Sequence, residues 1–291
     1  MSVYVISMRV CSGMATFYGR MPQLCQFNAK KHCYSRNHIK LRGITDTIKR
    51  EFASKYSWFR AKLGPTNDFF DLDRRSVPKG SRQGMNKGKR VDKQISRAAQ
   101  LMHKLDLTIG QFLMLPELMK KRQPKDKTEK SATTLSSTLL KNTRAFLLRW
   151  HKRGFIIKAC QYPVGDCIKR MGTGIDVVLY HPSEKSYLIV NTKVTAHKNY
   201  QKYTGKVNGE GVIEPDYLDS PYNELKINNC QQNQDQLQLL AETILWRKTL
   251  PEPQYQNLQS EINCCDASGV VREYPLQQWA ISKQDHFWFK L

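Results

Sequence analysis

Two runs of β-forming residues, 173–180 and 186–194, constrain the fold of this chain more than any other stretch. Both runs are rich in Val, Ile, Leu, Tyr and Thr, and most of these residue types favour extended structure. The segment between them contains Pro182 and Ser183, which favour a turn. The stretch therefore predicts a β-hairpin, and any fold of the chain has to build a sheet around it.

Polar residues interrupt this apolar hairpin at a few positions. Side chains alternate between the two faces of a strand. The second run therefore divides into two faces: Tyr187, Ile189, Asn191 and Lys193 on one, and Leu188, Val190, Thr192 and Val194 on the other. In the first run, Asp176 can point to the same spot as Asn191 and Lys193. A carboxylate, a second oxygen ligand and a lysine in one place suit a hard divalent ion, Mg2+ or Mn2+, that polarises a phosphate.

The charge of the chain indicates the class of its partner. Lys and Arg outnumber Asp and Glu by 47 to 25 in 291 residues, which gives a formal net charge of +22 and a pI near 9.7. This excess favours a polyanion: nucleic acid is the first candidate and an anionic membrane surface the second. No stretch approaches the roughly 20 apolar residues that a bilayer span requires, so no membrane span is expected. The eight cysteines form no CxxC pair, so free thiols are expected.

Two short motifs of the hairpin resemble a known family. Gly172-Thr-Gly-Ile-Asp176 followed by Asn191-Thr-Lys193 is similar to the paired motif of the PD-(D/E)XK nuclease superfamily, in its RecB-like or phage-exonuclease-like branch. Asn191 stands where that family has an acid. The resemblance implies an α/β fold with a restriction-endonuclease-like core, in which helices flank a mixed β-sheet, and here an inserted helical layer as well.

Three further segments resemble motifs of the same family, in the same order. Gly88-Lys-Arg-Val-Asp92 looks like the opening helix motif, with Asp92 in the position of a metal-facing residue. Without the resemblance, Asp92 is interpreted as a surface residue favoured by the helix dipole. Cys160-Gln-Tyr-Pro-Val164 matches a strand motif in which Gln161 replaces an acid, and Gln161 is interpreted as structural. Gln236 matches a helical glutamine motif, or belongs to a solvent-facing row of glutamines.

The resemblance implies a role for each matched residue. Asp92, Asp176, the side-chain oxygen of Asn191 and the carbonyl of Thr192 are expected to hold one Mg2+ or Mn2+. Lys193 is expected to position the nucleophile and offset charge on the phosphate, and Gln236 to orient it. The implied activity is that of a metal-dependent DNA nuclease, either an exonuclease or an end-processing enzyme.

Basic residues gather between positions 74 and 130, on both sides of an apolar helical stretch. The first cluster, rich in Gly and Ser, predicts a loop before a helix over 88–105. Arg82, Lys87, Lys89 and Arg90 are candidate phosphate contacts. A solvated linker with no binding role explains the same composition.

Three segments are expected along the chain. Residues 1–45 form a basic extension without acidic residues, typical of either a mitochondrial targeting segment or a DNA-contacting arm. Residues 46–84 form a helical and basic lead-in, and residues 85–291 the nuclease-like domain. Helices are expected over 45–62, 107–118, 134–153 and 229–248. A first strand is expected over 155–164, a long polar loop over 198–228, and an edge strand over 269–276.

Three functional hypotheses follow from these patterns. The first is a divalent-metal nuclease acting on DNA that is single-stranded or has free ends, in replication, recombination or repair. The second is a catalytically inactive nuclease-fold protein that binds nucleic acid. The third is an unrelated basic structural protein. A mitochondrial location, a nuclear location and a viral or mobile-element protein acting in a host cell are all compatible with the sequence.

Overall fold

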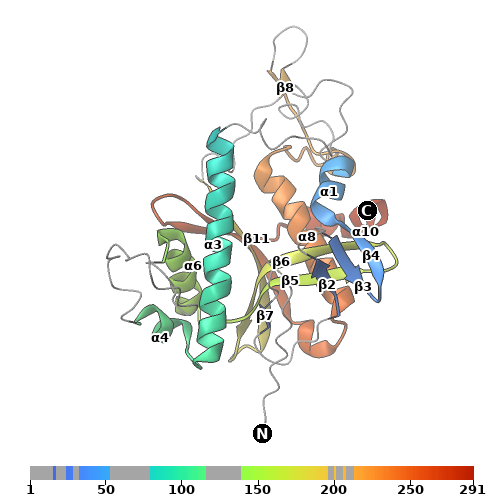
Figure 1. Cartoon of the computed structure of the whole chain (residues 1–291). Coiled ribbons are helices and arrows are strands. Elements are labelled where there is room, and N and C mark those ends of the chain that lie inside the picture. The colour runs from blue at the N-terminus through green and yellow to red at the C-terminus, as the bar shows by residue number, and fades with distance from the viewer. Residues whose placement is uncertain are drawn as a thin grey trace.

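In the computed structural model, helices cover both faces of one mixed β-sheet (Figure 1). The structure describes residues 16–17, 24–28, 33–52, 79–115, 139–195, 200, 206–207 and 213–291. The expected α/β class, with a mixed sheet between helices, is confirmed. The targeting segment proposed for the first residues lies largely outside this described part, as do residues 116–130 of the basic stretch and much of the long polar loop.

The predicted hairpin forms the centre of the sheet. β6 (Met171–His181) pairs antiparallel with β7 (Ser186–Val194), from His181 opposite Ser186 to Val177 opposite Val190. On its other edge, β6 pairs antiparallel along its whole length with β5 (Ile156–Asp166). The predicted division of faces along β7 is confirmed, because Leu188 and Val190 belong to one core cluster and Ile189 to the other.

Two strands from the C-terminal part of the chain extend the sheet beyond β7. β10 (Leu258–Cys265) lies parallel to β7, and β11 (Val271–Pro275) pairs antiparallel with β10 at the sheet edge, as predicted for an edge strand. Parallel neighbours require a crossover connection. Here the crossover contains α8 (Gln231–Thr249), which corresponds to the helix predicted over 229–248.

The N-terminal segment contributes strands as well. These are β1 (Thr16–Phe17), β2 (Gln26–Asn28), β3 (Cys33–Arg36) and β4 (Ile39–Gly43). β4 runs parallel to β6 at its first residues, and β1 pairs with β5. Residues 1–45 are therefore not a separate extension, because part of this segment belongs to the same sheet as the predicted nuclease-like domain.

One face of the sheet is covered by α3 (Lys79–Lys104), α4 (Ile109–Leu113) and α6 (Lys141–Lys152). Their apolar side chains, among them Val91, Phe112 and Trp150, pack with β5, β6 and β7 in one buried cluster. The helix α3 begins at Lys79, so the prediction of a loop up to residue 87 is wrong from that residue onward. Three glycines, Gly80, Gly84 and Gly88, lie in this helix, although glycine in a helix interior costs about 1 kcal/mol relative to alanine.

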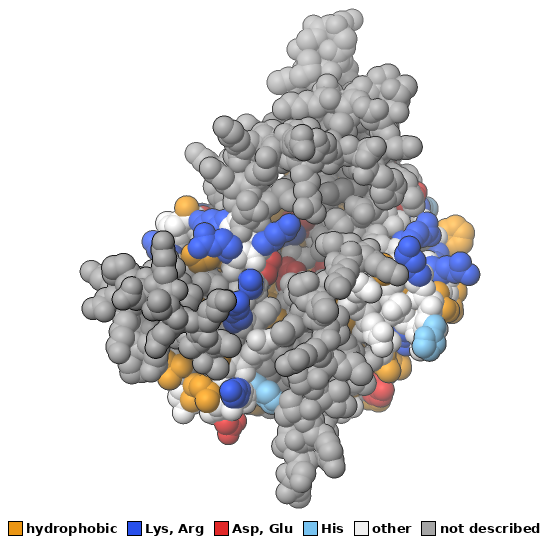
Figure 2. Space-filling view, viewed as in Figure 1, with side chains coloured by type: hydrophobic (Ala, Val, Ile, Leu, Met, Phe, Trp, Pro, Cys, Tyr) orange, Lys and Arg blue, Asp and Glu red, His pale blue; other side chains and the backbone are white. Residues whose placement is uncertain are grey.

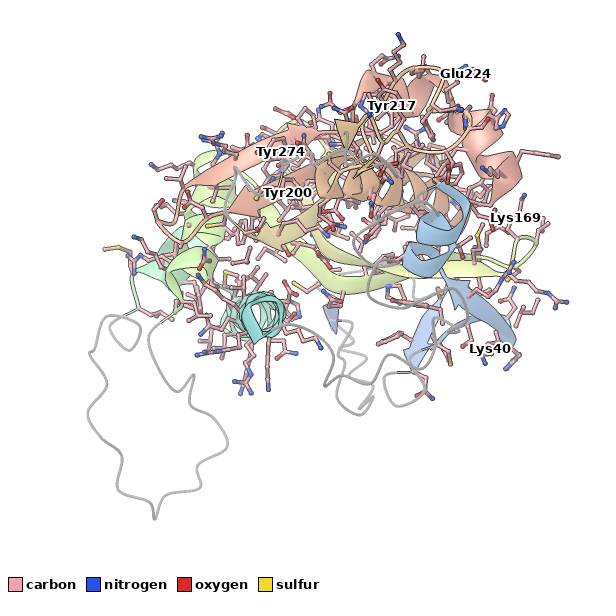
Figure 3. The ribbon with its side chains drawn as sticks, turned by 90° about the horizontal axis from the view of Figure 1, so that it is seen from above. Lys40, Lys169, Tyr200, Tyr217, Glu224 and Tyr274 are labelled. Carbon is pink, nitrogen blue, oxygen red and sulfur yellow. The ribbon has the colours of Figure 1, made fainter. Side chains whose placement is uncertain are left out.

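The opposite face carries α8 together with α1 (Ile44–Phe52), α9 (Gln278–Ser282) and α10 (Gln284–Lys290). Figure 3 shows α3 on one side of the sheet and α8, near Tyr200 and Tyr274, on the other. In α10, Phe287 is buried in the core, whereas Phe289 is 83% exposed. A two-stranded unit, β8 (Lys206–Val207) with β9 (Ile213–Glu214), lies apart from the main sheet.

No helix within the described ranges is long and apolar enough to cross a membrane. The cysteines of those ranges are free thiols.

Candidate functional site

The candidate site lies where β7 separates from β6. The β6–β7 ladder ends at Val177 opposite Val190, and β4 pairs with β6 only at Met171 and Gly172. Residues 173–176 of β6 therefore face a gap on this edge in the described ladder. Asp176 lies at the inner end of the gap, and its Oδ2 accepts a hydrogen bond of 2.9 Å from the backbone N–H of Thr192. This carboxylate thus replaces the missing strand partner of that N–H group.

Thr192 connects Asp176 to a second carboxylate on the helix α3. Its hydroxyl lies 3.2 Å from Oδ2 of Asp176 and 3.1 Å from Oδ1 of Asp92. One hydroxyl has one proton, so it can donate to only one carboxylate at a time. Burial, together with repulsion from Asp176, raises the pKa of Asp92 to about 7. We call Asp92, Asp176, Asn191, Thr192 and Lys193 the fork site.

Gln161 of β5 also contacts the fork site, although its sequence pattern was interpreted as structural. Its side-chain Nε2 donates to Oδ1 of Asp176 at 3.2 Å. The backbone of Gln161 has φ +52°, in the left-handed region that non-glycine residues rarely adopt. The alternation of faces breaks here, because Cys160 and Tyr162 pack in opposite core clusters although they are two residues apart. This break lies directly beside the carboxylate of Asp176.

Asn191 faces the helix α8, as the strand alternation predicts. Its side-chain Nδ2 donates to Oε1 of Glu242 at 3.3 Å, and Nε2 of Gln238 donates to the same oxygen at 2.7 Å. Glu242 is completely buried, and burial together with repulsion from Asp176 raises its pKa to about 8. None of the sequence motifs described above includes Glu242. The available signal was a Glu within an amide-rich helix that follows the hairpin, four residues after Gln238.

Lys193 lies on the same face of β7 and forms an ion pair with α8. Its Nζ lies 3.2 Å from Oδ1 of Asp235. Asp235 is itself held by the hydroxyl of Tyr200 and the amide of Gln231, each at 2.9 Å. Burial opposes the charge of Lys193, but attraction to Asp235 and Asp176 outweighs it and raises the pKa of the ammonium group. The group is therefore a permanent cation near neutral pH.

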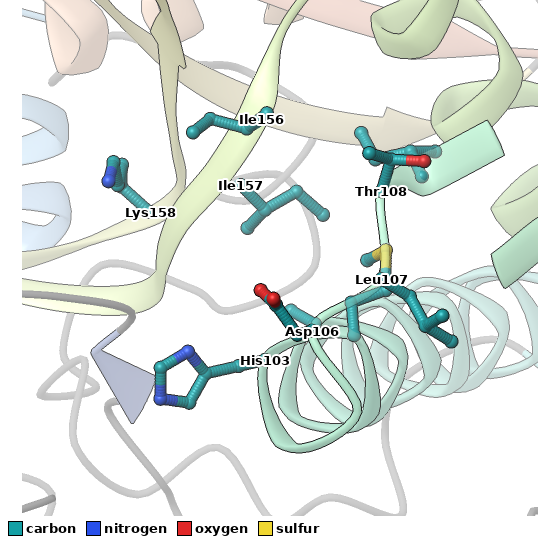
Figure 4. A pocket seen from close by; sticks show the side chains of 10 residues that line it. His103, Asp106, Leu107, Thr108, Ile156, Ile157 and Lys158 are labelled. Atoms are coloured by element: carbon teal, nitrogen blue, oxygen red, sulfur yellow. The ribbon is translucent and has the colours of Figure 1, made fainter. Parts of the chain in front are cut away.

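A cavity of about 200 Å³ opens beside this ammonium group. Its lining residues come from α1, β7 and α8: Thr45, Ile48, Lys193, Gln231, Gln234, Asp235 and Gln238. Figure 2, which has the viewpoint of Figure 1, shows acidic side chains near the centre of this face of the molecule, with Lys and Arg side chains around them. A larger cavity of about 360 Å³ lies elsewhere, between the end of α3 and β5, and His103, Asp106 and Lys158 line it (Figure 4). None of the predicted site residues lines that cavity.

Gln236 does not join the fork site. Its Nε2 donates to the carbonyl of Pro275 at 3.2 Å, and its Oε1 accepts from the backbone N–H of Gln277 at 3.0 Å. The side chain therefore holds the connection between β11 and α9, and the expected orienting role of Gln236 is wrong. Gln238, half a helical turn further along α8, donates instead to Glu242, the hydrogen-bond partner of Asn191.

The candidate phosphate contacts lie on α3. Lys89 and Arg90 are exposed, and Lys87 is half-buried. Arg82 lies in the first turn of this helix, and its side chain is outside the described part of the structure. Because the helix also carries Asp92, its exposed basic residues adjoin the acidic centre of the fork site.

The donor atoms of the fork site suit a hard divalent cation. Mg2+ is commonly bound by only one or two carboxylates and keeps several waters, and carboxylate and carbonyl oxygens suit Mn2+ equally. Asp92 and Asp176 supply two carboxylates, and the buried Oδ1 of Asn191 has no hydrogen-bond partner within the described ranges. Within the described residues, no group of three or more His, Cys, Asp or Glu side chains is arranged to hold a metal ion. Any ion here would therefore depend on amide, carbonyl and water oxygens besides these two carboxylates.

Comparisons with protein families, curated proteins and solved structures find no match to this chain. Its function must therefore be inferred from the geometry of the site.

Proposed function

We propose that this protein is a divalent-metal-dependent nuclease that cleaves DNA with single-stranded regions or free ends, built on a restriction-endonuclease-like core. The main observation in support is the hydroxyl of Thr192, which contacts Asp92 of α3 and Asp176 of β6. Two partly buried carboxylates repel each other there, and a cation would relieve that repulsion. An exonuclease or end-processing enzyme of DNA replication, recombination or repair is the corresponding class.

Each residue of the fork site has a role in this proposal. Asp92, Asp176, Oδ1 of Asn191 and the carbonyl of Thr192 would hold Mg2+ or Mn2+. When bound, the ion supplies Lewis-acid activation of water and of the scissile phosphate. Gln161 and the backbone N–H of Thr192 hold the carboxylate of Asp176 in a fixed orientation through hydrogen bonds of 3.2 and 2.9 Å.

Lys193 supplies positive charge to the reacting phosphate. Its ammonium group is attracted to Asp176 and lies on a cavity of about 200 Å³. A buried cation aimed at the phosphate stabilises the negative charge that builds up in the transition state. The ion pair with Asp235 fixes the position of this cation before the substrate binds.

The excess of basic residues supplies the attraction for DNA. Counterion release by Lys and Arg dominates nucleic-acid affinity and is independent of sequence. Lys89 and Arg90 are exposed on α3, within one turn of Asp92. Phosphates bound by this helix would therefore lie near the carboxylates.

A nucleic-acid-binding protein without cleavage activity is the second candidate. Two observations favour it: Asn191 offers an amide in the position of an acid, and the ammonium of Lys193 is already paired with Asp235. Fewer anionic ligands lower the affinity for a hard cation. Such a protein would keep the basic surface and lose the reaction.

An assay with end-labelled DNA separates the two candidates. Single-stranded and blunt duplex substrates are incubated with the full chain, with EDTA, Mg2+ or Mn2+. The nuclease proposal expects metal-dependent cleavage that falls at least 100-fold in Asp176→Asn and Lys193→Ala, as estimated from the loss of roughly 3 kcal/mol of transition-state stabilisation. The control variant Lys283→Ala, far along the chain, should cleave normally. Binding with no cleavage under any metal condition would instead establish the second candidate.

A further inference from the structure

Glu242 is a buried carboxylate that has no role in the metal site proposed above. It projects from α8, is completely buried, and accepts hydrogen bonds at Oε1 from Asn191 and Gln238. Its second oxygen, Oε2, has no hydrogen-bond partner among the described residues. An unsatisfied buried acceptor costs about 1–3 kcal/mol, and more when the group is charged. A side chain retained at such a cost requires an explanation.

The same location contains a second unpartnered oxygen. Oδ1 of Asn191 is buried and has no hydrogen-bond partner in the part of the chain that the structure describes, although the amide nitrogen donates to Glu242. Two orphan oxygens, one from β7 and one from α8, thus belong to side chains that touch each other. The lone pairs of buried oxygens are satisfied either by donors or by a cation. The neighbouring donor groups, Nδ2 of Asn191 and Nε2 of Gln238, already donate hydrogen bonds to Oε1 of Glu242.

The position of Glu242 complements the amide at residue 191. Asn191 places a neutral oxygen on β7, at the point where a carboxylate would complete a hard-cation site. Glu242 lies against that side chain, so α8 brings a carboxylate to the place where β7 lacks one. Asp176 is the acid of the fork site whose charge repels that of Glu242.

We propose that Glu242 is a ligand of the divalent cation, and that its Oε2 and the Oδ1 of Asn191 form the α8 side of the metal site. The inference rests on the metal site of the proposed function but requires no cleavage of DNA. The helix thereby replaces the acid that the strand lacks. Gln238 acts as a positioning residue, because its 2.7 Å hydrogen bond to Oε1 turns Oε2 toward the ion.

A purely structural role has a different signature. In that case Glu242 is a neutral carboxylic acid whose proton is donated from Oε2 to Oδ1 of Asn191, and no ion is involved. The substitution Glu242→Gln keeps the size and the neutral charge of such an acid. It separates the two roles, because it is harmless to a neutral acid and damaging to a metal ligand.

The test measures Mn2+ binding to the metal-free full chain without DNA, by electron paramagnetic resonance and titration calorimetry. We expect Glu242→Gln to weaken Mn2+ binding by about 10-fold or more, by comparison with the 10–100-fold effects of metal-site substitutions. The double variant Asn191→Asp with Glu242→Gln should recover most of that loss, because the carboxylate is returned to the strand. The matched control is Glu261→Gln, since Glu261 is buried but its Oε1 is hydrogen-bonded to Arg153 and Asn263.

Unchanged Mn2+ affinity in Glu242→Gln overturns the inference, as does a chain that binds no Mn2+ at all. A second measurement needs no substitution: bound Mn2+ should broaden the side-chain amide signals of Asn191 and Gln238 in nuclear magnetic resonance spectra. The amide of Gln236, on the same helix but bonded to Pro275, should be broadened less. Equal broadening of the three amides would also overturn the inference. A chain that binds Mn2+ through Glu242 but never cleaves DNA refutes only the nuclease proposal.

Discussion

The ammonium nitrogen of Lys193 lies 3.2 Å from Oδ1 of Asp235, so the cation of β7 is paired with α8. The pair is largely buried, because the side chain of Asp235 is 5% exposed and that of Lys193 26%. Tyr200 and Gln231 also donate to Asp235, which fixes the carboxylate. The position of Lys193 beside the cavity is thus determined by the helix as well as by its own strand.

Removal of the Asp235 charge should leave Lys193 buried without its counterion. We expect Asp235→Asn to lower the pKa of Lys193 and to destabilise the fold by roughly 3 kcal/mol, as when one partner of a buried pair is removed. Urea denaturation measures the stability, and a carbon-detected titration of the lysine side chain measures the pKa. The exposed pair of Lys283 with Glu224 provides the control, since Glu224→Gln should change stability by less than about 1 kcal/mol. Equal effects of the two substitutions would contradict the importance of the buried pair.

The stability of the metal-free protein should fall as pH rises from about 5 to 8. The pKa of Glu242 is raised from 4.5 to about 8, and that of Asp92 from 3.8 to about 7, because both carboxyls are buried near Asp176. Between the two values of each group, the folded state binds more protons than the unfolded state, so the contribution to stability is complete at low pH and is lost as pH rises. Each group adds at most about 1.4 kcal/mol per pH unit to this slope.

Glu242→Gln tests this pH dependence directly. The variant has no carboxyl to ionise at this position, so its free energy of unfolding should decline less between pH 5 and 8 than that of the wild type. Glu261→Gln is the buried control, because the Glu261 carboxylate is hydrogen-bonded to Arg153 and Asn263. Parallel pH profiles for Glu242→Gln and the wild type, in chelator-treated samples, would show that Glu242 does not titrate in this range.

The hydroxyl of Thr192 is expected to stabilise the pair of carboxylates it contacts. Thr192→Val removes the hydroxyl and keeps the shape of the side chain, so we expect a loss of about 1–2 kcal/mol at pH 7.5. The pKa of Asp92 should rise further, because this hydrogen bond lowers it in the wild type. Thr192→Ser keeps the hydroxyl and should keep the pKa of Asp92. If serine and valine shift the pKa of Asp92 equally, the contact with the hydroxyl is not responsible.

Much of the central sheet could be predicted from local patterns. The hairpin, its turn and its two faces follow from β-forming residues and from strict alternation, and these rules apply because both faces of β6 and β7 are buried. The shared face of Asn191 and Lys193 follows from the same rule, whereas the hydrogen bonds of Asp176 go to Thr192, which the alternation places on the opposite face. Asp92 was found only through its resemblance to a motif, since a single acid in a basic helix carries no signal of its own.

The polar interior explains what the sequence patterns missed. β10 contains Glu261 and Asn263, which break the apolar pattern of a buried strand, yet Arg153 and Trp150 satisfy them by hydrogen bonds of 2.6 and 2.8 Å. The buried face of α8 is also polar, because Asp235 and Glu242 are buried against other polar groups. Hydrophobic periodicity cannot detect such a face. Only the strand pairing, which joins segments far apart in the sequence, reveals which polar residues meet.

The basic surface of α3 should contribute to DNA affinity through charge. We expect the double variant Lys89→Ala with Arg90→Ala to bind single-stranded DNA more weakly and to reduce the slope of log affinity against log salt by roughly 1.4, since each phosphate contact contributes about 0.7. Arg247→Ala with Lys283→Ala removes the same charge elsewhere: Arg247 lies on α8, across the sheet from α3 (Figure 3). Fluorescence anisotropy at several salt concentrations measures both slopes. If the two double variants lose the same slope, the attraction comes from net charge alone, and α3 is not the DNA-binding surface.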